Sequence, residues 1–250
     1  MSGHSKWHSI KHKKGAADKA RGKLFAVLIR QVEVTARTGG GDPDTNATLR
    51  AMIQKARDNS VPIDTIHRAI RRGTGEEEGV VYEAINYEGY APHGVAVYVQ
   101  CLTDNRNRTG PEMRNVFSKN GGSFAEAGSV AWQFDRKGVV MVAQSATSED
   151  DLMMVAADAG AEDISEVGED FQVLTPSAEL HAVRTAIEEA GIAVKSSDLT
   201  LIPSTTVAIT DESAAKQILR LLDALEDHDD VEAVYANCDI SEDVLEAVLS

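Results

Sequence analysis

The sequence has few of the features that mark secreted, disulfide-rich or membrane proteins. Only two of its 250 residues are cysteine, Cys101 and Cys238, so a disulfide framework is excluded and reduced, buried thiols are expected. No apolar run approaches the roughly 18 residues of a membrane-spanning helix. The segment that begins at Met1 lacks the apolar core of a signal peptide. We therefore expect a soluble, cytoplasmic protein that does not associate with membranes.

Motifs for enzymatic chemistry are also scarce. The chain contains no Gly-x-x-x-x-Gly-Lys phosphate loop and no Gly-x-Ser-x-Gly nucleophile elbow. His4, His8 and His12 share a four-residue spacing, but lysines surround them and disfavour a bound zinc ion. Paired carboxylates, such as those at 150–151 and 229–230, lie in acidic runs typical of a solvated surface. We expect no enzyme, no catalytic residue, no metal site and no cofactor.

Negative charge dominates the chain, and positive charge is concentrated at one end. The formal net charge is −15. Residues 1–75 carry 15 Lys/Arg and 6 Asp/Glu, whereas residues 76–250 carry 10 Lys/Arg and 34 Asp/Glu. This split indicates an end that faces a polyanion, joined to a body that a polyanion repels. Alternatively, the acidic body is only a soluble surface.

The most basic stretch is residues 1–23, which we call the basic arm. It holds seven Lys/Arg against one acid, with three histidines and one tryptophan among them. Clustered cations displace counterions from nucleic-acid phosphates, and an aromatic ring can stack on an unpaired base. The alternative is a solvated basic tail without a partner. We predict that the arm binds nucleic acid through Lys6, Trp7, Lys11, His12, Lys13, Lys14, Lys19, Arg21 and Lys23.

Three short amphipathic helices are expected in and after the arm. A helical period begins at Asp18, and its apolar stripe continues to Ala36, before the three glycines at 39–41. Asp44 is expected to cap a second helix, and Asp64 a third.

The third helix, over residues 65–72, would bury aliphatic side chains and expose basic ones. A basic helix after a short turn is found in helix-turn-helix proteins, but any three-helix bundle also has a charged outer face. Both interpretations stay open for the arginines at Arg68, Arg71 and Arg72.

Beyond an acidic linker at 75–79, the apolar pattern changes to the alternation of strands. We expect strands over residues 80–87 and 95–102. Thr109 and Glu112 have the spacing of a capping box, which predicts that a helix begins at Thr109.

The pattern after residue 135 contains the order β-α-β-β-α-β, which is typical of a ferredoxin-like domain. A strand over 207–209, a helix over 212–228 and a strand over 231–235 would then complete the sheet begun before residue 135. We therefore predict an α+β protein with three domains. These are the basic arm plus a helical bundle at 1–75, a discontinuous α+β domain at 76–135 and 204–250, and an inserted ferredoxin-like domain at 136–203.

Residues 103–109, with the sequence Thr-Asp-Asn-Arg-Asn-Arg-Thr, form a second candidate site between a strand and a helix. Arg106 and Arg108 could hold a phosphate near the start of that helix. Alternatively, Asp104, Asn105 and Asn107 make turn hydrogen bonds, and the arginines pair with nearby acids. The first interpretation would suit an enzyme that acts on a phosphorylated ligand, which is the alternative function that we retain.

Distinctive sequence blocks lie along nearly the whole chain, at Gly3–Trp7, Ile10–Lys14, Arg21–Lys23, 39–43, 68–75, 87–90, 103–109, 121–122, 128–130 and 234–237. Together these blocks resemble the YebC family. The chain departs from the family pattern at Ile63, where a lysine is common, at Ala91 and His93, which replace glycines, and at Phe124–Ala125, which replaces Leu-Gly.

The resemblance implies a non-enzymatic factor in gene expression. YebC proteins are usually labelled probable transcriptional regulators and are related to the mitochondrial translational activator of cytochrome c oxidase. Two roles have been assigned to them: a promoter-binding regulator, and a ribosome-associated translation factor that assists difficult peptide bonds such as consecutive prolines. The expected partners are therefore ribosomal RNA, contacted at the ribosome, or promoter DNA.

The residues themselves favour RNA over DNA. A flexible basic arm with a tryptophan suits unpaired bases, and a strongly acidic body is poorly suited to wrapping duplex DNA. A small helical bundle could still dock in the major groove. A monomer is favoured. A scaffold that recruits a basic protein through its acidic surface is a further hypothesis.

Overall fold

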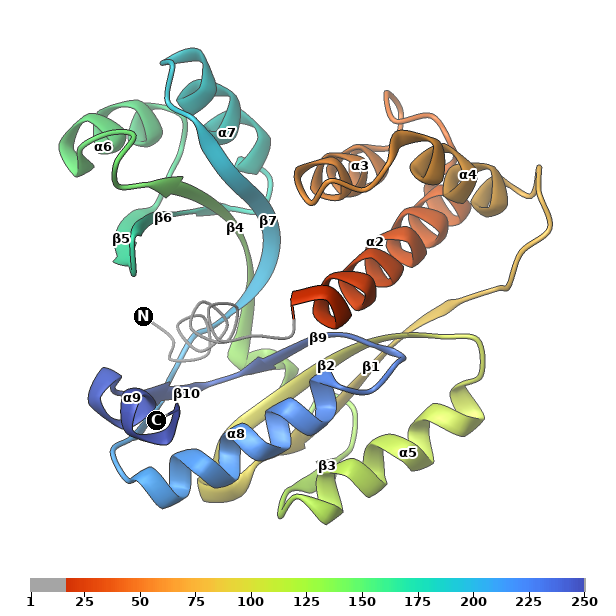
Figure 1. Cartoon of the computed structure of the whole chain (residues 1–250), viewed down its shortest axis with the longest axis vertical. Helices are drawn as coiled ribbons and strands as arrows, with labels where there is room; N and C mark the ends of the chain where they lie inside the picture. The colour runs from red at the N-terminus through yellow and green to blue at the C-terminus, as the bar shows by residue number, and fades with distance from the viewer. Residues whose placement is uncertain (1–16, 250) are drawn as a thin grey trace. The chain divides into compact units, whose positions relative to one another are not determined.

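The computed structural model describes residues 17–249, and the side chains of all of these except residues 17–21, 242 and 249. Two compact units form: one spans Asp135–Ile202, and the other comprises the described residues on either side of it. Figure 1 shows the helices and strands of both units along the chain.

Three helices pack together at the start of the described chain: α2 (Ala17–Gly39), α3 (Ala47–Asp58) and α4 (Ile63–Thr74). Their apolar stripes form one core, and α2 crosses α4 closely at Gly73. A Cβ atom there would lie 2.4 Å from the carbonyl oxygen of Glu33, which is too close for any other residue. The buried core consists of Leu28, Val32, Ala36, Leu49, Ala56, Val61, Ile66 and Ala69.

The predicted caps of the second and third helices are wrong. Asn46, not Asp44, caps α3, since its Oδ1 accepts a hydrogen bond from the Leu49 N–H at 3.0 Å. The Asn46 amide also donates to carbonyl oxygens at the end of α2, which an aspartate could not do. Helix α4 begins at Ile63, with Pro62 at the N-cap, so Asp64 lies inside its first turn.

The second half of this unit is an α+β structure. Its sheet has the order β3-β1-β2-β9, and β8 and β10 pair separately in parallel. Because β9 pairs with β2, the segment after the inserted unit does complete the sheet begun before it. The elements are β1 (Glu83–Tyr90), β2 (Ala96–Thr103), α5 (Arg106–Lys119), β3 (Ser123–Ala125), β8 (Val207–Ile209), α8 (Glu212–Glu226), β9 (Val231–Ala236), β10 (Cys238–Ile240) and α9 (Glu242–Leu249).

Helix α5 begins earlier than its capping-box pattern predicts. Asn105 is the N-cap residue, and its side chain accepts a hydrogen bond from the Arg108 N–H at 3.2 Å. Thr109 is therefore fully buried inside the first turn, where its hydroxyl donates to the Asp230 carboxylate at 2.8 Å. The capping-box prediction is wrong because a tertiary contact uses the Thr109 hydroxyl. Strand β1 likewise begins at Glu83 rather than at residue 80.

The turn between β1 and β2 has an unusual backbone. In the short 3₁₀ turn Pro92–Gly94, His93 has φ 67° and ψ 16°, in the left-handed region that favours glycine. His93 replaces a glycine of the family pattern, and it does so at a position where a glycine would adopt this backbone conformation without steric cost.

The inserted unit has the ferredoxin-like arrangement. Its sheet order is β5-β6-β4-β7, in which each split β-α-β element contributes one central and one edge strand. The α+β class and the ferredoxin-like domain are thus confirmed; the limits of the three domains stay our proposal. The elements are β4 (Phe134–Ala143), α6 (Glu149–Asp158), β5 (Asp163–Val167), β6 (Asp170–Pro176), α7 (Leu180–Glu189) and β7 (Val194–Pro203).

A buried carboxylate lies where α2 meets β9. Burial raises the pKa of Glu232 to about 7, although a hydrogen bond from Gln31 and the positive charges of Arg30 and Lys55 act in the opposite direction. Oε1 of Glu232 has no hydrogen-bond partner among the described residues. Keeping this carboxylate ionised therefore costs stability near neutral pH.

Glu232 should make the unfolding free energy depend on pH. Its folded pKa lies above the unfolded value, so its contribution is complete below about pH 4.5 and is lost as the pH rises through about 7. The loss amounts to at most about 3 kcal/mol. Urea unfolding of the wild type and Glu232→Gln at pH 5, 6, 7 and 8 should show the variant gaining relative stability with pH. Parallel curves would contradict the burial of this carboxylate.

Candidate nucleic-acid interface

Most of the predicted basic arm lies outside the described residues. This applies to Lys6, Trp7, Lys11, His12, Lys13 and Lys14. Lys19 and Arg21 belong to α2, but the structure does not describe their side chains.

Lys23, the last residue of the arm, contacts the protein itself. Its ammonium donates hydrogen bonds to the carbonyl oxygens of Glu226 and His228, the latter at 2.7 Å. These carbonyls lie at the end of α8, where a positive charge is stabilised by the helix dipole. Burial lowers the pKa of Lys23, and Asp227 and Asp229 oppose that effect. Lys23 is thus placed to hold α2 against α8.

Arg30, about two helical turns further along the same face of α2, makes a similar contact. Its guanidinium donates to the Asp229 carbonyl oxygen at 3.0 Å and lies over the Tyr82 ring, 5.6 Å from the centroid. The helical bundle is therefore attached to residues 226–230, from the last residue of α8 to the residue before β9, which we call the α8–β9 turn.

The three arginines predicted on α4 have different surroundings. Arg72 Nε donates to Oε2 of Glu33 at 2.9 Å, and the Glu33 side chain is only 3% exposed. Arg37 binds the other Glu33 oxygen at 3.3 Å. Arg72 therefore bridges α4 to α2 across the bundle.

Arg68 and Arg71 lie on the outer face of α4. Arg71 pairs with Glu77, with Nε 2.6 Å from Oε1. Arg68 is exposed, and no hydrogen bond or ion pair within the described part of the chain involves it. His67 is exposed beside it, and Ile63, where the family often has lysine, is 47% exposed at the start of the helix. This outer face leaves Arg68 available to a phosphate.

The arginines of the 103–109 segment are occupied by acids to different degrees. Arg108 binds Asp230 at 2.8 Å and Asp104 at 3.0 Å, and its Nε lies 3.7 Å from Glu112. Arg106 is exposed and lies 4.0 Å from Glu83. Three carboxylates around Arg108 leave little net attraction for a phosphate. The structure thus favours the second interpretation of this segment, in which its arginines pair with acids.

Asp230 is the centre of this polar cluster. Burial alone would raise the pKa of Asp230, but hydrogen bonds from Arg108, Thr109 and Thr103 bring the pKa below its usual value. The Asp230 N–H donates to Nδ1 of His228, whose Nε2 lies 3.1 Å from a Glu112 oxygen. The cluster joins α5 to the α8–β9 turn. Sequence reasoning missed it because 122 residues separate Arg108 from Asp230.

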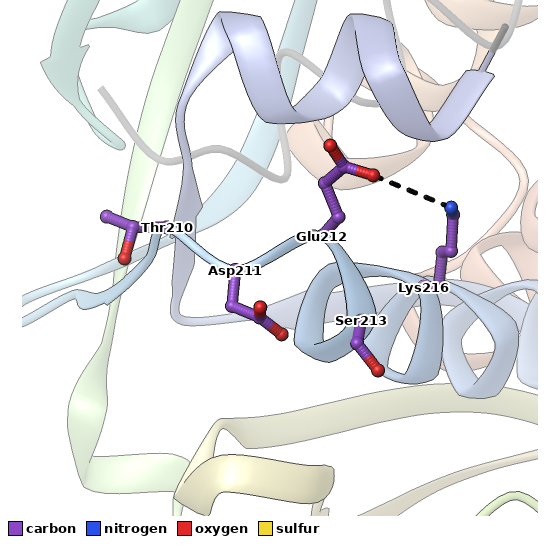
Figure 2. Close-up of a pocket in the computed structure, with 5 residues that line it drawn as sticks. All are labelled: Thr210, Asp211, Glu212, Ser213 and Lys216. Atoms are coloured by element: carbon purple, nitrogen blue, oxygen red, sulfur yellow. Dashed lines mark ion pairs between the residues drawn. The ribbon is translucent and has the colours of Figure 1, made fainter.

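A surface pocket at the N-terminus of α8 is unsuited to an anion. Its volume is about 600 Å³, and it is open to solvent. Figure 2 shows Asp211 and Glu212 lining it, with an ion pair between Glu212 and Lys216. The Asp211 carboxylate accepts from the Ala214 N–H at 2.8 Å, which uses the helix N-terminus internally. Two carboxylates and one paired cation offer no phosphate site.

Several further findings bear on other classes of site. No group of three or more His, Cys, Asp or Glu within residues that the structure describes is arranged to hold a metal ion. Burial raises the pKa of both cysteine thiols to about 12, so they are buried thiols without nucleophilic character. None of the helices in the described chain is long and apolar enough to span a membrane.

A second tryptophan was not singled out from the sequence. Trp132 is 74% exposed, and its indole N–H donates to the Ser129 carbonyl oxygen at 3.1 Å. The turn that carries it is held by the buried carboxylate of Glu88, which accepts hydrogen bonds from three backbone N–H groups. No sequence signal separates this exposed tryptophan from a core one.

Comparison with known proteins identifies the family. Residues 5–76 match the TACO1/YebC protein N-terminal domain, and residues 82–238 match the TACO1/YebC second and third domain. The chain belongs to the TACO1/YebC family. Since the matched residues cover most of the chain, the resemblance noted in the sequence is confirmed.

Relatives within the family are similar over their full length. A protein of Thermobifida fusca is 56% identical over 98% of both chains, and one of Salinispora arenicola is 55% identical over the same share. Both carry the name probable transcriptional regulatory protein. A crystal structure of a conserved hypothetical protein from Aquifex aeolicus is 44% identical and covers 93% of this chain and 96% of its own, with a TM-score of 0.84.

Two arginines on α4 allow a test of which cations are structural. Arg72→Ala would leave the buried Glu33 carboxylate with Arg37 alone and should lower the unfolding free energy by about 1–3 kcal/mol. Arg68→Ala should change it by less than about 0.5 kcal/mol. Urea unfolding measures both. Adding Glu33→Gln to Arg72→Ala should recover part of the loss. Equal destabilisation by both single variants would contradict the assignment.

Proposed function

We propose that this TACO1/YebC protein is a non-enzymatic, nucleic-acid-binding regulator of gene expression that acts on RNA at the ribosome. In this proposal the basic arm makes the main contact, and the outer face of α4 adds Arg68 beside it. Lys23, Arg71 and Arg72 are left out of the contact, because each is already bound within the protein. The observation that carries the proposal is the separation of charge between residues 1–75 and the acidic remainder.

The body of the protein supports this division by what its surfaces offer. The side of the ferredoxin-like sheet opposite the helices carries Val139, Met141, Gln172, Leu174, Asp163 and Ser165 on its strands β4, β6 and β5. None of these side chains is aromatic, whereas RNA-binding sheets of similar topology stack bases on aromatic side chains. Lys137, on the same side of β4, is already paired with Glu162. A polyanion would also meet the negative charge of this domain, which has 14 Asp/Glu and 4 Lys/Arg over residues 135–202.

RNA is favoured over duplex DNA for two reasons. Trp7 lies among the cations of the arm, and an indole can stack on unpaired bases but has no comparable partner in a closed duplex. A protein with a net charge of −15 is also repelled by long duplexes, whereas a short basic segment can enter a crevice of folded RNA. The family's translation role, assistance at difficult peptide bonds, fits a contact with ribosomal RNA.

The names of the relatives agree with a regulatory protein. Those names refer to transcription, and a transcriptional regulator would have promoter DNA as its target. Docking of α4 in a major groove is the corresponding model, and Arg68 is the side chain that it would use.

A phosphate-ligand enzyme centred on Arg106 and Arg108 finds less support. The carboxylates of Asp104 and Asp230 hold Arg108 within about 3 Å of their oxygens, where a phosphate would have to compete with both. Saturable binding of a nucleotide to this segment in a ligand-binding screen would support that alternative.

The arm should give binding a strong dependence on salt. Contact with about six phosphates lowers the affinity roughly 10³-fold between 50 and 200 mM salt. Replacing Lys11, Lys13 and Lys14 by alanine should reduce the slope of log K against log[salt] by about 2 for single-stranded RNA, or about 3 for duplex DNA. Fluorescence anisotropy with labelled RNA measures this, while an unchanged melting temperature shows that the fold is intact. A slope equal to that of the wild type would sink the proposal.

The two tryptophans permit a direct test of where nucleic acid binds. In Trp132→Phe, Trp7 is the only indole, and unpaired RNA should quench its fluorescence through stacking, whereas duplex DNA should quench it little. The matched variant Trp7→Phe leaves Trp132 as the reporter for the body. Quenching confined to Trp132 would show that the body, not the arm, binds RNA. Equal quenching of Trp7 by duplex DNA would favour the promoter model.

A further inference from the structure

Helix α6 of the ferredoxin-like unit is apolar on two opposite sides. Leu152 and Ala156 are fully buried in the core of the unit. Met154, on the opposite side, is 67% exposed, and Met153, on the flank between the two sides, is 39% exposed. A helix that is apolar on both sides is normally covered on both. Of the large apolar side chains that the described chain exposes, these are the only neighbours within one helix.

Acidic residues surround the two methionines. Helical spacing places Asp150, Met153, Met154 and Ala157 on one face, because they follow the i, i+3, i+4, i+7 pattern. Glu149 and Asp151 lie in the first turn with Asp150, and Asp158 lies in the last turn. We call the exposed side formed by Asp150, Met153, Met154, Ala157 and Asp158 the α6 face.

The carboxylates of the α6 face have no cation within the described chain. No ion pair there involves Asp150, Asp151 or Asp158. The cations of the unit that form ion pairs do so elsewhere: Lys137 with Glu162, Arg184 with Glu188, and Lys195 with Asp170. The acids of α6 thus remain available to a positively charged partner.

We propose that the α6 face binds a cationic amphipathic segment of a partner protein. Methionine side chains are flexible and polarisable, and they bind the apolar side of such segments in proteins that accept several partners. The flanking carboxylates would pair with lysines or arginines on the edges of the segment. Helix α6 is about 15 Å long, so the matching segment would have two to three helical turns.

Charge decides against the other classes of occupant. The only charged side chains on this helix are carboxylates, which repel nucleic acid and anionic lipid. In a symmetric contact, a second copy of this chain would bring the same acidic face. The proposal is independent of the proposed function, since it uses neither the basic arm nor α4.

The test uses the full chain and a defined probe. The probe is a fluorescein-labelled peptide of about 14 residues with Leu and Lys at helical spacing, and a scrambled peptide of the same composition is the control. Fluorescence anisotropy measures the affinity at several salt concentrations. We expect the amphipathic peptide to bind at least about tenfold more tightly than the scrambled one, because only it presents one apolar side to the methionines.

Three double variants locate the site. Met153→Ser with Met154→Ser should lower the affinity about tenfold or more, and Asp150→Asn with Asp158→Asn should lower it and weaken its salt dependence. Glu166→Gln with Glu189→Gln makes the same change in charge at exposed positions on β5 and α7, and should alter the affinity by less than about twofold. RNA binding should be equal in all three variants, which separates this test from that of the basic arm.

Several outcomes would overturn the proposal. One is equal binding of the amphipathic and scrambled peptides, which would mean attraction to diffuse charge. Another is that the Glu166 and Glu189 variant loses as much peptide affinity as the Asp150 and Asp158 variant. A third is that the methionine variant changes sedimentation from a dimer to a monomer without altering peptide affinity, which would make the α6 face a contact between copies. Should the methionine variant fail to fold, the Asp150 and Asp158 variant decides alone.

Discussion

The attachment of the basic helical bundle to the acidic α+β structure depends on the α8–β9 turn. Lys23 and Arg30 of α2 donate to its carbonyl oxygens, while Arg108 and Thr109 of α5 bind the carboxylate of Asp230. Cations of α2 and α5 therefore meet carbonyl and carboxylate oxygens at one short segment. Removing Arg108 would leave the buried Asp230 carboxylate with less compensation, which costs far more than an exposed ion pair contributes.

This attachment also separates the cations into two kinds. Lys23, Arg72 and Arg108 are of the residue types that bind phosphates. Each of them, however, is bound to oxygens of the protein itself. Arg68 is exposed and remains available to a partner. The acidic body in turn is more than a solvated surface in our proposal, since the methionines of α6 are set among its carboxylates. A basic end for RNA and an acidic helix for a basic protein would let one chain connect the two.

Much of the fold can be predicted because the local periodicity of apolar residues indicates its helices and strands. The alternation after residue 135 gave the ferredoxin-like order, and the strand at 231–235 was recognised as the partner of an earlier sheet. The errors fall where a side chain serves a distant group. Asn46 caps α3 because its amide also reaches the end of α2, and Thr109 is inside α5 because Asp230 accepts its hydroxyl hydrogen bond. Capping rules consider only neighbours in sequence, so neither could be foreseen.

By itself, the sequence determined the charge separation, the absence of disulfide and phosphate-loop chemistry, the fold class and the family, because each follows from composition or from motifs of adjacent residues. Only the tertiary structure decided which cations are available. Arg68 and Arg72 are equivalent in the sequence, four residues apart on one basic helix, yet Glu33 of α2 binds Arg72 and not Arg68. The structure likewise decided that Trp132, Met153 and Met154 are exposed. Pairing and exposure depend on which residues fold against each other, and no local pattern specifies that.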